Sequence, residues 1–133
     1  MIQTQELTNR PVLALDMKKN RIRVHRITLH LLGDPDYIQL LVNPDDKVVI
    51  IKKSKQEDRL SLHIRWKQLG EKQCCEFTSK SLLESIRSLQ SDWVPDQTYK
   101  IYGNLYHNNA LAAFPLNNSI VMNPPSEMRV PLS

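Results

Sequence analysis

The stretch "LDMKKNRIRVHR", from Leu15 to Arg26, combines a strand pattern with a dense positive charge. Six of its twelve residues are Lys, Arg or His, and only one is acidic. Ile22 and Val24 alternate with basic residues, which is typical of a strand with one buried and one exposed face. Asn20 precedes this strand and tolerates the left-handed backbone of a tight turn. The stretch therefore predicts a β-hairpin whose second strand carries a basic face.

Hydrophobic patterning along the remaining chain predicts hairpin, helix, hairpin, and then the same order again. The apolar stripe Leu82, Leu83, Ile86 and Leu89 predicts the second helix, which either Ser81 or one of Thr78 and Ser79 caps. The expected strands cover residues 12–16, 21–25, 37–42, 48–52, 60–66, 73–77, 99–105 and 110–116, and the expected helices cover residues 27–32 and 79–89.

This order gives two ββαββ units, residues 8–54 and 59–117, followed by a flexible tail over 118–133. The predicted fold is mostly β with two short helices, an α+β class. A single unit cannot bury both of its hairpins, so we expect the strands of the two units to interleave in one compact domain. Closing such strands into a β-barrel would remove exposed sheet edges.

Composition points to a reduced protein of the cytoplasm. The chain has 133 residues, of which 41% are hydrophobic and 24% charged, as in ordinary globular proteins. No apolar run approaches the roughly 20 residues that span a bilayer, and no signal pattern opens the chain. Cys74 and Cys75 are adjacent, a spacing that rarely forms a disulfide. We therefore expect a cytoplasmic protein without membrane contact, in which one of these two cysteines faces the core.

The positive charge is unevenly distributed. The net charge is +4, and residues 1–66 carry all of the excess. Residues 10–26 alone hold six Lys or Arg residues against the single acid Asp16. A localised basic patch of this kind is typical of proteins with a phosphate-rich partner.

The first half of the chain resembles a known DNA-binding family. "LDMKKNRIRVHRITLHLLG", an apolar strand and then "DDKVVIIKK" resemble the SpoVT-AbrB domain, and the tandem units are similar to MraZ proteins. Asn20 stands where the family usually has Gly, and His25 where it usually has Pro. The second unit lacks the family's Asp-x-x-Gly-Arg element. The resemblance implies a swapped-hairpin barrel in which the first unit contacts DNA.

The same resemblance implies which residues contact double-stranded DNA. We also expect a homo-oligomer, because one basic hairpin makes few phosphate contacts and symmetry multiplies them. The implied DNA-binding residues are Lys18, Lys19, Arg21, Arg23, His25 and Arg26. A second interpretation is a solvated strand face on an accessory or antitoxin-like module, which kept the fold and binds a protein partner without binding DNA.

Nothing in the sequence indicates an enzyme. Only three glycines occur, and none forms a phosphate-binding loop motif. We find no Ser/His/Asp constellation, no supported pair of carboxylates and no zinc-type spacing. We therefore expect a non-catalytic protein with no catalytic residues, no bound metal and no cofactor.

Overall fold

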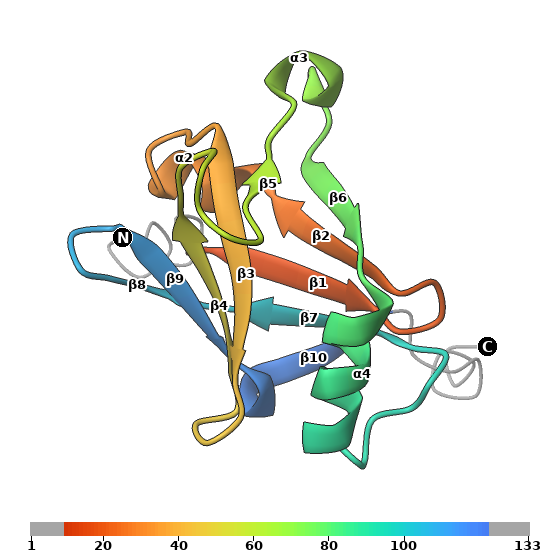
Figure 1. Cartoon of the computed structure of the whole chain (residues 1–133). Coiled ribbons are helices and arrows are strands. Elements are labelled where there is room, and N and C mark those ends of the chain that lie inside the picture. Colours follow the sequence, from red (N-terminus) through yellow and green to blue (C-terminus); the bar gives the residue numbers. More distant parts are fainter. Residues whose placement is uncertain (1–9, 123–133) are drawn as a thin grey trace, which may run out of the picture.

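The computed structural model describes residues 10–122, which form an α+β fold composed mostly of strands (Figure 1). The helices are α2 (Arg26–Leu31), α3 (Trp66–Leu69) and α4 (Lys80–Leu89), with a short 3₁₀ helix at Leu116–Asn118. The strands are β1 (Val12–Asp16), β2 (Arg21–His25), β3 (Tyr37–Asn43), β4 (Val48–Lys53), β5 (Leu62–His63), β6 (Cys74–Thr78), β7 (Thr98–Tyr102), β8 (Asn104–Tyr106), β9 (Leu111–Pro115) and β10 (Ser119–Met122). No helix between residues 10 and 122 has the length and apolar character needed to cross a membrane.

These strands form two antiparallel five-stranded sheets. Sheet A has the order β10-β7-β1-β2-β6, and sheet B has the order β5-β3-β4-β9-β8. Each sheet therefore contains strands from both halves of the chain. The first hairpin lies inside sheet A, between strands β7 and β6 that come much later in the sequence.

The β1–β2 hairpin forms at the residues that the sequence predicts. Leu13 pairs with Val24 and Leu15 with Ile22 across the two strands. All four side chains are completely buried. Burying an aliphatic side chain of this size stabilises a fold by about 1.5–3 kcal/mol relative to leaving it exposed. One face of the hairpin is therefore committed to the core, and the basic residues of β2 lie on the other.

The core fills the space between the two sheets. Ile51 and Phe114 contribute from sheet B, and Leu83 and Ile86 contribute from α4, all without exposed surface. Helix α4 begins after Ser79, whose side chain accepts a hydrogen bond from the backbone N–H of Leu82. Of the predicted alternatives, Ser79 is thus the capping residue.

The two sheets do not close into a barrel, which differs from our expectation. The strand predicted over 60–66 is reduced to the two residues of β5, followed by the unpredicted helix α3. Leu60 has a φ of +62° and lies 74% exposed, so the chain turns where the alternating pattern predicted a strand. Within the described residues 10–122, β5 pairs only with β3, and β6 pairs only with β2. Both strands therefore remain edges of separate sheets.

Gly103 divides the strand predicted over 99–105 into β7 of sheet A and β8 of sheet B. A Cβ atom at this position would lie 2.6 Å from the carbonyl oxygen of Ala113 and 2.7 Å from the ring of Phe114. Only glycine fits this close approach. The chain therefore passes from one sheet to the other at Gly103.

The flexible tail that we expected over 118–133 contains an ordered strand. Ser119–Met122 form β10, which pairs with β7 along the edge of sheet A. Proline-rich residues follow this strand in the sequence, and a strand of four residues gives a weak local signal beside them. Residues 123–133 lie outside the described part of the chain.

Candidate nucleic-acid interface

The turn between β1 and β2 presents Lys18 and Lys19 to solvent. The carboxylate oxygen Oδ1 of Asp16 accepts hydrogen bonds from both of their backbone N–H groups, each at 3.1 Å. Asn20 has a φ of 54°, the left-handed conformation that the sequence predicts. Arg87 of α4 donates to Oδ1 of Asn20 at 3.1 Å and also to a backbone carbonyl of the turn. The two exposed lysines therefore extend from a turn whose backbone is fixed.

A row of charged side chains crosses the outer face of sheet A. Ala14 of β1 is directly opposite both Arg23 of β2 and Lys100 of β7, and Arg23 is directly opposite Glu76 of β6. Directly paired residues point to the same face of a sheet. The adjacent row contains the buried Leu13, so this row lies on the face away from the core. The sheet thus gathers charges from widely separated parts of the sequence.

Two acidic residues pair with the arginines of β2. Arg23 donates from Nε to Oε2 of Glu76 at 3.0 Å, and its Nη2 lies 3.5 Å from Oδ2 of Asp16. Nη1 of Arg21 lies 3.9 Å from Oε1 of Glu76. The side chains of Arg21 and Glu76 are 42% and 47% exposed, and exposed pairs of this kind contribute only about 0–1 kcal/mol. Glu76 therefore orients the two guanidinium groups. Because these ion pairs are weak, an anion that replaces Glu76 loses little free energy in breaking them.

Arg26 uses its donors within the fold. Its Nε donates to the carbonyl of Lys72 at 3.0 Å, and its Nη2 donates to the same carbonyl at 2.8 Å and to the carbonyl of Gly70. These contacts attach the start of α2 to the turn between α3 and β6. Among the residues that the resemblance implies, Arg26 is thus turned away from the β2 row toward this turn.

His25 lies at the end of the β2 row, directly opposite Cys74 of β6. Its side chain is half-buried. Burial, and then the positive charge of Lys100, lower the pKa of His25 below its ordinary value of 6.5. At neutral pH the imidazole is therefore uncharged and adds hydrogen-bonding capacity to the face, but no positive charge.

Sequence reasoning did not assign Arg10 and Lys100 to this face. The guanidinium carbon of Arg10 and the ammonium of Lys100 lie 5.7 and 5.1 Å from the ring centroid of Tyr102. Tyr102 is directly opposite Val12 of β1, so the aromatic ring belongs to the same sheet face. The alternation of Lys100 with the buried Tyr99 and Ile101 marks an outward position. Only the pairing of β7 with β1 shows which surface it joins.

The two adjacent cysteines of β6 lie on opposite faces of the strand. Both cysteines are free, Cys75 packs against the core as one of the two was expected to, and Cys74 points outward. Burial raises the pKa of both thiols, which keeps them protonated and weakly nucleophilic at neutral pH. Within residues 10–122, no three His, Cys, Asp or Glu side chains gather in a way that could bind a metal ion.

Comparisons of this chain with protein-family models, curated proteins and solved structures find no match, and nothing in them identifies a SpoVT-AbrB or MraZ relationship.

Proposed function

We propose that this protein binds duplex DNA through the outer face of sheet A. The observation that carries the proposal is the excess of basic side chains on this one face. The basic residues are Arg10, Arg21, Arg23 and Lys100 on the face itself and Lys18 and Lys19 in the adjoining turn, and the acidic residues are Asp16 and Glu76. Their excess of positive charge equals the net charge of +4 of the whole chain.

Phosphates are the partner that best fits these groups. Arginine donates two parallel hydrogen bonds to a phosphate, and each neutralised phosphate releases condensed counterions. A phosphate that replaces Glu76 beside Arg23 and Arg21 would meet guanidinium groups that are already ordered by the fold. Lys18 and Lys19 extend the same surface beyond the end of the strands, where a second phosphate group of the backbone could bind.

An AbrB-type arrangement and homo-oligomerisation belong to the same proposal. The presence of strands from both halves of the chain in each sheet supports a swapped-hairpin topology without a closed barrel. One such face makes few phosphate contacts, and a symmetric oligomer would multiply them. The alternative function is a protein-interaction module, which the pairing of Arg21 and Arg23 with Glu76 favours because paired charges need no external partner.

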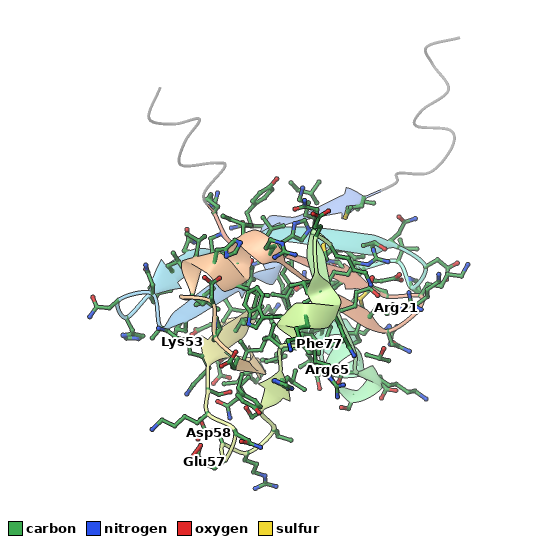
Figure 2. All side chains as sticks on the ribbon, turned by 90° about the horizontal axis from the view of Figure 1, so that it is seen from above. Arg21, Lys53, Glu57, Asp58, Arg65 and Phe77 are labelled. Atoms are coloured by element: carbon green, nitrogen blue, oxygen red, sulfur yellow. The ribbon has the colours of Figure 1, made fainter. Side chains whose placement is uncertain are left out.

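The test is a titration of a labelled mixed-sequence duplex at several salt concentrations. We expect the dissociation constant to rise steeply with salt. In an Arg21→Ala/Arg23→Ala variant, the slope of log K against log salt should decrease by about 2. The control is Lys53→Ala/Lys55→Ala, which removes the same charge elsewhere, since Arg21 and Lys53 lie on opposite sides of the molecule in Figure 2.

The two variants separate the competing interpretations. Loss of affinity in the arginine variant but not in the lysine variant would support the assigned face. Equal losses would mean that affinity follows net charge alone. An absence of binding to the duplex even at low salt would overturn the proposal and favour the protein-interaction module.

A further inference from the structure

An open groove of about 910 Å³ lies where the two sheets fail to close. It runs between β5, α3 and β6, and its lining includes the apolar side chains of Leu62, Leu69, Cys75 and Phe77. Ligand-binding clefts in proteins are typically about 300–1,000 Å³, so the groove lies at the upper end of that range. In the outer-face row, by contrast, Arg23, Glu76 and Lys100 are charged, and the exposed Ile120 of β10 lies beyond them, directly opposite Lys100. The groove adjoins this row, because Arg23 and Glu76 also line it, but its apolar floor has different chemistry.

Among residues 10–122, β6 pairs on one side only, with β2, and its other side borders this groove. The N–H of Arg26 donates to the carbonyl of Gln73, and the N–H of Ser79 donates to the carbonyl of Asn20. Gln73 and Ser79 thus form hydrogen-bonded pairs at the two ends of β6. Because such pairs alternate along antiparallel strands, the odd-numbered residues of β6 form their backbone hydrogen bonds with β2. The backbone groups of the even-numbered residues face the open edge instead. These residues are Cys74, Glu76 and Thr78.

The end of the groove beside α3 is basic. Arg65 precedes α3 and Lys72 follows it, and both side chains line the groove. Neither forms an ion pair within residues 10–122. Arg65 and Phe77 both line the groove, whereas Figure 2 shows the acidic residues Glu57 and Asp58 on a projecting loop away from Arg65. Two cations are thus available to a ligand at one end of an apolar floor.

We propose that the open edge of β6 binds an extended segment of a partner protein, which adds to sheet A as a sixth strand. Every pair in sheet A is antiparallel, and the added strand continues this pattern. Its apolar side chains enter the groove over Cys75 and Phe77. Its C-terminal end then lies beside α3, where carboxylates meet Arg65 and Lys72. The partner segment is therefore apolar at alternate positions and ends in acidic residues.

The charges favour a different protein over a second copy of this chain. A second copy that paired through the same three residues would place Glu76 opposite its own counterpart, and like charges directly opposite each other destabilise a sheet. The apolar side chains on the floor of the groove suit the alternating apolar side chains of a strand better than a phosphate backbone. The inference does not depend on DNA binding, because it uses the edge and the inner face of β6.

The probe is a short fluorescent peptide in which Val alternates with Thr and which ends in Glu-Glu, with a matched peptide ending in Lys-Lys. We expect the acidic peptide to bind more tightly, measured by fluorescence anisotropy. The exchange of the Glu76 and Thr78 amide hydrogens, followed by nuclear magnetic resonance, should slow on binding. This second readout detects strand addition in the unaltered protein, even when binding is weak.

Three variants test the geometry. Cys74→Pro removes an outward N–H at the first residue of an edge strand, a position that tolerates proline, and should weaken binding by about tenfold. Cys74→Ala removes the thiol and keeps the N–H, so the difference between the two variants isolates the backbone contact. Circular dichroism confirms that each variant is folded. An Arg65→Glu/Lys72→Glu variant should reverse the preference between the two peptides.

Three results would overturn the proposal. They are an absence of binding by either peptide at millimolar concentration, equal affinity of Cys74→Pro and Cys74→Ala, and amide exchange at Glu76 and Thr78 that is unchanged by saturating peptide. None of these measurements contains DNA, so their failure is distinct from failure of the duplex titration. The sixth strand would be supported by slowed amide exchange in the unaltered protein, together with a reversed preference between the two peptides in the Arg65→Glu/Lys72→Glu variant.

Discussion

Arg23 donates to Glu76 across a distance of 3.0 Å and thereby joins the basic strand β2 to the edge strand β6. The two residues are 53 positions apart in the sequence and directly opposite in the sheet. Glu76 also lies 3.9 Å from Arg21, so one carboxylate faces two guanidinium groups. An acidic side chain at this position acts as an internal competitor for any anion that approaches the outer face of sheet A.

This competition predicts that Glu76→Gln increases the affinity for duplex DNA. Removing the carboxylate frees both arginines and removes a negative charge that repels phosphate. Because an exposed ion pair is worth about 0–1 kcal/mol, the affinity should rise by up to about fivefold. The control is Glu84→Gln, which removes the same charge from α4. Equal effects of the two substitutions in the duplex titration would show that Glu76 has no specific role.

A second prediction concerns Arg26, whose guanidinium bonds to the carbonyls of Gly70 and Lys72. Arg26→Ala should lower the free energy of unfolding by about 1 kcal/mol, because it removes charge-assisted hydrogen bonds at a partly exposed site. Chemical denaturation measures this change, and Lys67→Ala on α3 is the exposed control. Unchanged stability together with weakened duplex binding would instead assign Arg26 to the DNA contacts that the family resemblance implies.

A third prediction concerns the pH dependence of stability. His25 faces Cys74 and the positively charged Lys100, and burial followed by the Lys100 charge lowers its pKa in the folded state. Below its ordinary value of 6.5, the unfolded chain therefore binds more protons at this residue than the folded chain. The contribution of His25 to stability is complete above that pH and decreases as the pH falls through the lowered pKa.

The measurement is urea denaturation between pH of about 7.5 and about 5, on either side of the histidine range. His25→Gln should lose less stability on acidification than the unaltered protein. The control is His107→Asn, at an exposed turn position whose φ of 55° asparagine tolerates. An identical loss of stability in His25→Gln and in the unaltered protein would contradict the assignment to His25.

Local patterns identify the β1–β2 hairpin and helix α4, because their signals lie within a few residues. Asn20 marks the turn, the alternation around Ile22 and Val24 marks the strand, and the apolar stripe marks the helix. The same alternation over 60–66 predicted a full strand, but the tertiary structure turns the chain at Leu60 and leaves β5 with two residues.

Only the local part of the candidate site was predicted from the sequence. The basic residues of the first hairpin were visible in one short stretch of sequence. Glu76 and Lys100 join them only through the strand order of sheet A, in which β2 lies beside β6 and β1 beside β7. Pairing between distant strands follows from the packing of the whole chain, and a single sequence carries no local signal for it. For the same reason, the sequence did not predict β10 or the groove beside β6, which both depend on contacts between distant segments.

The fourth prediction tests the passage between the sheets. Gly103→Ala would place a methyl group 2.6 Å from the carbonyl oxygen of Ala113 and within 2.7 Å of the completely buried Phe114 ring. Neither the backbone of β9 nor a buried aromatic ring moves easily, so the substitution should lower the free energy of unfolding by about 1–3 kcal/mol.

Thermal and urea denaturation measure this loss. Asn104→Ala, at the exposed neighbouring position, is the control and should change stability little. If Gly103→Ala were as stable as Asn104→Ala, the result would contradict the close packing of Gly103 against β9. The loss expected here would instead show that one glycine is required for the chain to contribute strands to both sheets.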